Sequence, residues 1–168
     1  QRDSTPSPGR DDSSSSLFTY DRNGLVEVTT DTVRTVNGVT LRDAHYAASS
    51  PRHGQVRFYL VRPAGNGPFA GVLFFHWLGR PKGNREEFLE EALHLASEGV
   101  VSLLIQGYFP WREDPVNGPA DRQQVIDQSI DTRKALDLLL REPGVDPQKI
   151  AYVGHDYGAM FGAILAGL

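Results

Sequence analysis

The chain has 168 residues, of which 39% are hydrophobic and 23% charged, and its formal net charge is -4. This size and balance predict one soluble globular domain with a sizeable core, and the lack of a Lys/Arg cluster argues against nucleic acid as the main partner. The chain contains no cysteine, which excludes disulfides, thiolate metal sites and a cysteine nucleophile, and no apolar run approaches the roughly 20 residues of a membrane-spanning helix.

Residues 1–16 form a polar segment with two prolines and the serine run Ser13–Ser16. Such a segment buries too little apolar surface to fold, so we expect a disordered tail before a domain over residues 17–168. The chain begins with Gln1 and not Met, which favours a linker left by removal of a signal peptide and hence a secreted or periplasmic protein. An ordinary disordered N-terminus of a cytoplasmic protein is the alternative.

The first part of the predicted domain has the pattern of antiparallel strands. Leu25–Thr30 and Val33–Val36 are rich in β-branched residues and alternate. Asn37-Gly38 is a strong hairpin signal, and Val39–Leu41 follows as the return strand. Gln55–Val61 alternates again, which predicts a half-buried strand.

After a turn that contains Gly and Pro, buried strands alternate with helices. The apolar runs Gly71–His76, Val100–Gln106 and Lys149–Val153 are typical of parallel strands covered on both faces. Helices are predicted between them, the first from a capping box over Asn84–Glu87 and the second from Asp121. With right-handed crossovers, this order predicts an α/β fold with a mainly parallel sheet, helices on both faces and an antiparallel N-terminal hairpin.

The most informative motif follows the third buried strand. It reads Gly154-His155-Asp156-Tyr157-Gly158 and leads into a helix-compatible stretch over residues 159–168. This is the strand–turn–helix context of a nucleophile elbow, in which the two glycines allow the tight turn that presents the central side chain. The usual central residue is serine, whereas this chain has Asp156.

The order of the elements and the segments Tyr59–His76 and Arg133–His155 resemble the α/β-hydrolase superfamily, and within it the dienelactone-hydrolase and acetyl-xylan-esterase branch. The resemblance runs from about Leu17 to the end of the chain and corresponds to the N-terminal half of that fold, truncated after the elbow. It implies a hydrolase that acts on an ester-like or other small organic substrate without a metal or cofactor. The family's catalytic acid and histidine lie on later strands, which these residues do not include.

The resemblance also implies roles around the elbow. Asp156 occupies the nucleophile position, and the Tyr157 N–H would be one oxyanion donor. The second donor is expected in the loop after the Gly71–His76 run, at the Leu78 N–H, with the Trp77 N–H as the second candidate. We expect His76 and His155 to be hydrogen-bonding residues and not bases.

The chemistry of Asp156 leaves two interpretations. A carboxylate is ionised at neutral pH and suits attack on an sp³ carbon, as in haloalkane dehalogenases and epoxide hydrolases, sister families of this fold. Tyr157 and Leu78, however, replace the Trp and Asn that such dehalogenases use. The alternative is a catalytically inactive hydrolase-like module that binds a ligand or partner, because Asp tolerates the unusual backbone angles of the turn.

Two further expectations concern the surroundings. Tyr108, Trp111 and Arg112 follow the Val100–Gln106 run and are candidates for lining a pocket at the carboxyl edge of the sheet. The Lys149–Val153 strand would be an edge strand in this half of the fold, and a long apolar edge invites pairing. We therefore expect self-association, or a second chain that completes the sheet; a monodisperse monomer in size-exclusion chromatography would contradict this.

Overall fold

The computed structural model describes residues 15–22, 24, 26–79, 83–108 and 118–168. Most of the predicted tail therefore lies outside the described residues. A short 3-10 helix, η1 (Ser15–Phe18), opens the described chain. No helix in these ranges has the length and apolarity needed to cross a membrane.

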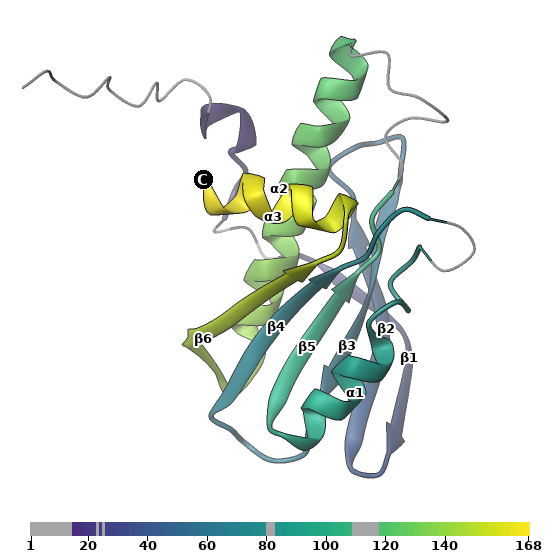
Figure 1. Ribbon diagram of the computed structural model, residues 1–168, viewed down its shortest axis with the longest axis vertical. Coiled ribbons are helices and arrows are strands. Elements are labelled where there is room, and N and C mark those ends of the chain that lie inside the picture. The colour runs from purple at the N-terminus through teal and green to yellow at the C-terminus, as the bar shows by residue number, and fades with distance from the viewer. Residues whose placement is uncertain (1–14, 23, 25, 80–82, 109–117) are drawn as a thin grey trace, which may run out of the picture.

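Within the described ranges, six strands form one sheet in the order β1-β2-β3-β5-β4-β6 (Figure 1). The strands are β1 (Val28–Val36), β2 (Val39–Ala47), β3 (Gln55–Arg62), β4 (Phe69–Phe75), β5 (Val100–Ile105) and β6 (Val145–Gly154). The pairings from β1 through β3 to β5 are antiparallel, whereas β5, β4 and β6 run parallel. The predicted sheet with an antiparallel N-terminal hairpin is confirmed, and the antiparallel β3–β5 pairing makes it a mixed sheet.

The helices lie on both sides of this sheet, as predicted. They are α1 (Leu89–Ser97), α2 (Pro119–Arg141) and α3 (Tyr157–Ala166). Figure 1 shows α1 in front of the sheet and α2 behind it, with α3 crossing at the end where β6 stops. The helices and the sheet therefore form a layered α/β domain, and the elbow lies at one edge of the sheet.

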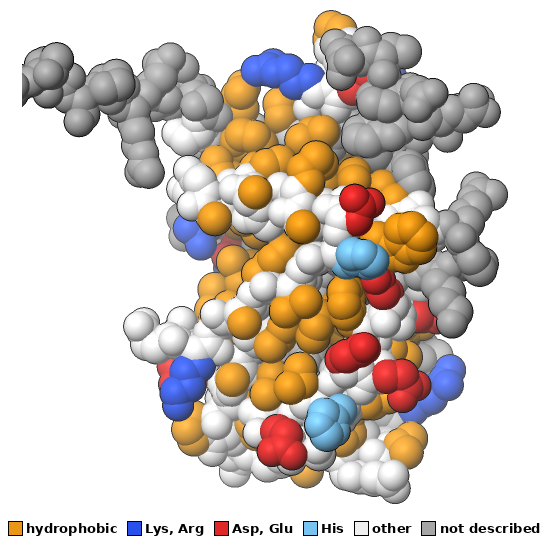
Figure 2. Space-filling model, viewed as in Figure 1, with side chains coloured by type: hydrophobic (Ala, Val, Ile, Leu, Met, Phe, Trp, Pro, Cys, Tyr) orange, Lys and Arg blue, Asp and Glu red, His pale blue; other side chains and the backbone are white. Residues whose placement is uncertain are grey.

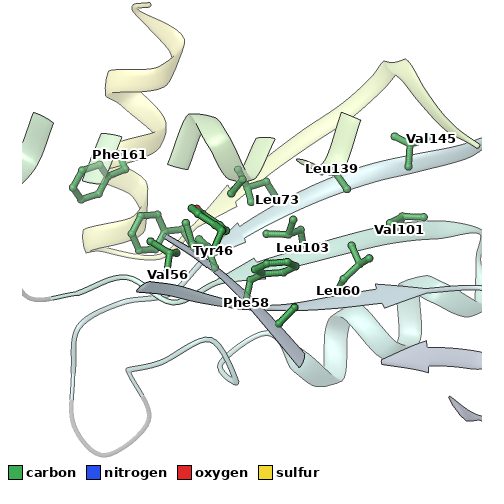
Figure 3. Close-up of a cluster of buried hydrophobic side chains, with 14 of the residues drawn as sticks. Tyr46, Val56, Phe58, Leu60, Leu73, Val101, Leu103, Leu139, Val145 and Phe161 are labelled. Carbon is green, nitrogen blue, oxygen red and sulfur yellow. The ribbon is translucent and has the colours of Figure 1, made fainter. Parts of the chain in front are cut away.

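Strand β4 shows why the continuous apolar runs are buried on both faces. Leu73 points into the larger hydrophobic cluster, which includes residues of α2 and α3 (Figure 3), and Phe75 belongs to the same cluster. Val72 and Phe74 alternate with them and belong to the second cluster, which α1 covers. Because side chains alternate along a strand, a strand covered by helices on both sides must be apolar throughout.

The N-terminal hairpin differs in one respect from the sequence prediction. Two strands were expected before Asn37, but β1 is a single strand whose register shifts between Thr30 and Thr32. A bulge of this kind bends the strand without ending it. Asn37 and Gly38 have φ values of 51° and 78°, which are the positive angles that a two-residue hairpin turn requires.

Both predicted helix starts need correction. The capping box over Asn84–Glu87 does not form: α1 begins at Leu89, and Asn84 Oδ1 accepts a hydrogen bond from the Glu86 N–H (2.6 Å) in the preceding turn. The Glu87 carboxylate instead accepts hydrogen bonds from Trp77 and His155.

The second helix starts two residues before the predicted Asp121. Pro119 is the first residue of α2, where its missing N–H costs nothing and its φ fits a helix. Asp121 instead accepts a hydrogen bond from the Gly118 N–H (3.2 Å).

Strand β6 contains the predicted Lys149–Val153 segment and lies at one end of the sheet. Among the described strands it pairs only with β4. Hydrophobic side chains gather on the face that carries β6 and α3 (Figure 2), and Val153 and Met160 are about two-fifths exposed, at 38% and 39%. The end of the sheet next to the elbow is thus both apolar and open.

The turn before α1 is fixed to the sheet by an ion pair. Arg85 donates to both carboxylate oxygens of Asp43, at 2.6 and 2.8 Å, and its guanidinium lies over the Tyr59 ring. Both charged side chains are largely buried. Although burial alone would raise it, the hydrogen bonds and charge of Arg85 hold the pKa of Asp43 below its ordinary value.

We predict that Asp43→Asn lowers the free energy of unfolding by about 2 kcal/mol at neutral pH, between the roughly 0.5 of an exposed pair and the roughly 3–5 of a fully buried one. Since the folded-state pKa lies below the unfolded value of about 3.9, the stabilisation is present above that value and is lost as the pH falls through the folded-state pKa. Urea unfolding of wild type and variant at neutral and acidic pH measures this. Asp146→Asn is the control, because Asp146 pairs with the exposed Lys149 and accepts the Gln148 N–H (2.9 Å) within its own turn; an equal loss in both variants would contradict the prediction.

Candidate active site

The strand–turn–helix arrangement expected for the elbow lies between β6 and α3. β6 ends at Gly154, α3 begins at Tyr157, and Asp156 between them has φ 47° and ψ -103°. A non-glycine residue with such angles is strained and is held there only by its surroundings. The turn therefore has the backbone geometry that presents a side chain at the end of a strand.

The two glycines of the motif are required by close contacts between backbone segments. A Cβ added at Gly158 would lie 2.1 Å from the carbonyl oxygen of Phe75, and one added at Gly154 would lie 2.5 Å from the Gly158 carbonyl carbon. The His155 N–H donates to the same Phe75 oxygen (3.1 Å). The elbow thus rests directly on the end of β4, and only glycine fits at these two positions.

The Asp156 side chain is exposed at the start of α3. It occupies the N-cap position, yet its carboxylate makes no capping hydrogen bond to the helix. An Asp at this position commonly accepts a hydrogen bond from the first turn. The unusual backbone angles turn the side chain away from that role.

The loop after β4 was expected to carry the second oxyanion donor. Its first residue, His76, is 1% exposed. His76 Nε2 accepts the Gly107 N–H (2.9 Å), so the proton is on Nδ1, which donates to the Trp77 carbonyl (2.5 Å). Burial lowers the pKa of His76, and the neutral ring joins the loops that follow β4 and β5.

Glu87 connects this loop to the elbow, which the sequence did not indicate. One carboxylate oxygen accepts the Trp77 N–H (2.8 Å) and the other accepts His155 Nδ1–H (2.5 Å). The rings of Trp77 and His155 lie 5.8 Å apart. The Trp77 amide is therefore engaged in this structure, whereas Leu78, the first candidate, packs half-buried against the main core.

Behind the elbow, the side chain of Tyr157 enters a buried polar network. Its hydroxyl contacts Gln128 Nε2 on α2 and lies 3.3 Å from the Tyr108 carbonyl oxygen. Gln128 Oε1 in turn accepts the Tyr108 N–H (2.8 Å). Burial raises the pKa of the Tyr157 hydroxyl, so it stays a neutral hydrogen-bonding group.

The other candidates from the sequence contribute less. Trp111 and Arg112 lie outside the described residues. Tyr108 is half-buried and stacks on His53, with ring centroids 3.6 Å apart. Across the described ranges, no group of three or more His, Asp and Glu side chains could hold a metal ion.

The known proteins most useful for comparison are esterases of known structure. An acetyl xylan esterase from Paenibacillus sp. superposes with a TM-score of 0.66 at 20% identity, over 93% of this chain and 53% of that one. A cold-adapted esterase from an Arctic intertidal metagenomic library gives 0.54 at 21%, over 80% and 56%. Acetyl xylan esterase 1 from Thermoanaerobacterium sp. gives 0.56 at 14%, over 83% and 48%.

No protein-family model matches the sequence, and no curated relative was found. At these identities the structural likeness establishes the fold alone, and the chain spans about half the length of the esterases it matches. The family resemblance read from the sequence is confirmed at that level. The chain has the α/β-hydrolase fold found in acetyl xylan esterases, over about half of their length.

Proposed function

We propose that the protein is an α/β-fold hydrolase in which Asp156 is the nucleophile and the substrate is a small organic molecule. The observation that carries the proposal is the strained backbone of Asp156, at φ 47°, with an exposed carboxylate that does not cap the following helix. Strain of this kind at a non-glycine residue is typical of catalytic turns. On the family's pattern, the Tyr157 and Leu78 amides are the oxyanion donors, and Leu78 is favoured over Trp77 because the Trp77 N–H already donates to Glu87.

The carboxylate favours substitution at an sp³ carbon over attack on an ester carbonyl. An Asp156 oxygen forms a C–O bond to that carbon, and the leaving group departs with the electron pair of the broken bond. Water then attacks the carbonyl carbon of the enzyme ester, which regenerates the carboxylate and releases an alcohol. Attack on an ester would instead form a mixed anhydride and expel a strongly basic alkoxide.

The hydrolytic step needs a group that activates water. On the family's pattern this is a histidine with its acid partner, from strands that follow the elbow. His155 is held by Glu87 through Nδ1, and we assign it to the wall of the site and not to this role. The free edge of β6 is where we propose that the sheet is completed, by further strands or by a second chain.

The test is covalent labelling. We expect an alkyl halide or epoxide probe to add its alkyl group to the wild-type chain, with the adduct on Asp156 in peptide mapping, and Asp156→Ala to take up none. Glu98→Ala, which removes an exposed carboxylate at the end of α1, should label like wild type. A wild-type chain that is never labelled would overturn the nucleophile proposal and favour the alternative, a hydrolase-like module that binds without catalysis.

A further inference from the structure

Gln128 is a buried polar residue that none of the roles above uses. It lies in the middle of α2 and is 1% exposed. Its amide contacts two segments that are distant from it in the sequence: Tyr108, just after β5, and Tyr157, the first residue of α3. A buried amide is stabilising only when its donors and acceptor are used, and here both are.

The contacts of Gln128 form a closed set with the two tyrosines. Gln128 Oε1 accepts the Tyr108 N–H (2.8 Å), and Nε2 donates toward the Tyr108 carbonyl (3.3 Å) and to the Tyr157 hydroxyl. The Tyr157 hydroxyl also reaches the Tyr108 carbonyl (3.3 Å). One side chain therefore links α2, the loop after β5 and the elbow.

The Tyr157 ring also packs against aromatic side chains of the core. It packs edge-on against Phe75 and Phe161, whose ring centroids lie 5.9 and 4.9 Å away. Edge-on aromatic contacts tolerate rotation and sliding more readily than directional hydrogen bonds do. The hydrogen bond to Gln128 therefore adds a directional constraint on the Tyr157 side chain and, through its backbone, on Asp156.

We propose that Gln128 is a positioning residue for the Asp156 nucleophile and for the Tyr157 amide, which it holds in register with the loop after β5. This inference rests on the proposed function of Asp156. A small misplacement of reacting groups costs up to about a hundredfold in rate. Loss of the hydrogen bonds that join Gln128 to Tyr108 and Tyr157, here called the clamp, should therefore slow ester formation at Asp156 without preventing folding.

The first experiment compares rates of Asp156 labelling. We expect Gln128→Leu to lower the rate constant by about tenfold or more, and Tyr157→Phe to lower it in the same direction. The double variant should be little slower than Gln128→Leu alone, because both changes break one clamp. Ser129→Ala is the matched control: Ser129 is as deeply buried on α2, and its hydroxyl donates within the helix, to the Val125 carbonyl.

The second experiment does not depend on catalysis. In Gln128→Leu, the Tyr108 amide should lose protection from hydrogen exchange, and the backbone amide NMR shifts of Asp156 and Tyr157 should move. Neither should change in Ser129→Ala. If Gln128→Leu does not fold, the backbone amide NMR shifts of the elbow are measured in Tyr157→Phe instead.

The outcomes separate the two proposals. If wild type is labelled and Gln128→Leu reacts as fast as Ser129→Ala, the positioning inference is wrong and the proposed function stands. If wild type is never labelled, the proposed function is wrong. The positioning role of Gln128 is then tested by the amide shifts alone, and it is wrong if the Asp156 and Tyr157 shifts do not move in Gln128→Leu.

Discussion

Replacing Gly158 with alanine is expected to lower the free energy of unfolding by about 3 kcal/mol or more, the upper end of what overpacking costs. The added Cβ would lie 2.1 Å from the Phe75 carbonyl oxygen, 2.7 Å from its carbon and 3.1 Å from the His76 oxygen. All three are backbone atoms at or just after the end of β4, so the clash cannot be relieved by rotating a side chain. Urea unfolding followed by circular dichroism measures the loss.

Gly167→Ala is the control for this substitution. It changes the same residue type at the other end of α3, where the nearest atom to an added Cβ is the Ile164 carbonyl oxygen at 3.5 Å. We expect its stability to stay within about 0.5 kcal/mol of wild type. If Gly158→Ala were equally mild, the close approach of the elbow to β4 would be wrong.

The second large effect is expected from Phe161→Ala, which should cost about 3–5 kcal/mol, as other deletions of buried aromatic rings do. Phe161 is fully buried on α3 and stacks on Phe75, with centroids 5.3 Å apart. It is the main apolar anchor of the helix that follows the nucleophile position. Its removal leaves a cavity between α3 and the end of β4.

The control for Phe161→Ala is a second variant of α3, measured by the same unfolding experiment. Met160→Ala removes the neighbouring side chain, which is 39% exposed, and should cost no more than about 1 kcal/mol. A Phe161→Ala variant as stable as Met160→Ala would show that α3 is not anchored in the core. Because α3 carries the elbow at its start, we also expect Phe161→Ala to react more slowly at Asp156.

The sheet and the elbow could be predicted because their patterns are local. Strands β4 and β5 are buried on both faces, and this requires a mainly apolar run that is visible in the sequence, interrupted in β5 by the buried Ser102. The turn at Asn37-Gly38 is encoded in two residues with positive φ. The elbow can be predicted from its glycine spacing, because each glycine lies too close to a neighbouring backbone segment to carry a side chain.

The supporting residues could not be predicted because their partners are distant in sequence. Glu87 fits a capping box at Asn84, but the tertiary contacts with Trp77 and His155 take its carboxylate instead. Gln128 belongs to a polar stretch of α2 that hydropathy assigns to solvent. In the structure Gln128 is buried against Tyr108 and Tyr157, and hydrophobic periodicity in the sequence does not predict these contacts.

The contact between the elbow and the end of β4 has a consequence for folding. The Phe75 carbonyl accepts the His155 N–H and contacts Gly158, so the strained angles of Asp156 are held by a segment far away in the chain. Contacts of long sequence separation form late, after the loop-closure entropy has been paid. The elbow is therefore expected to acquire its geometry only after β6 has paired with β4, and to be among the first parts to open when that pairing loosens.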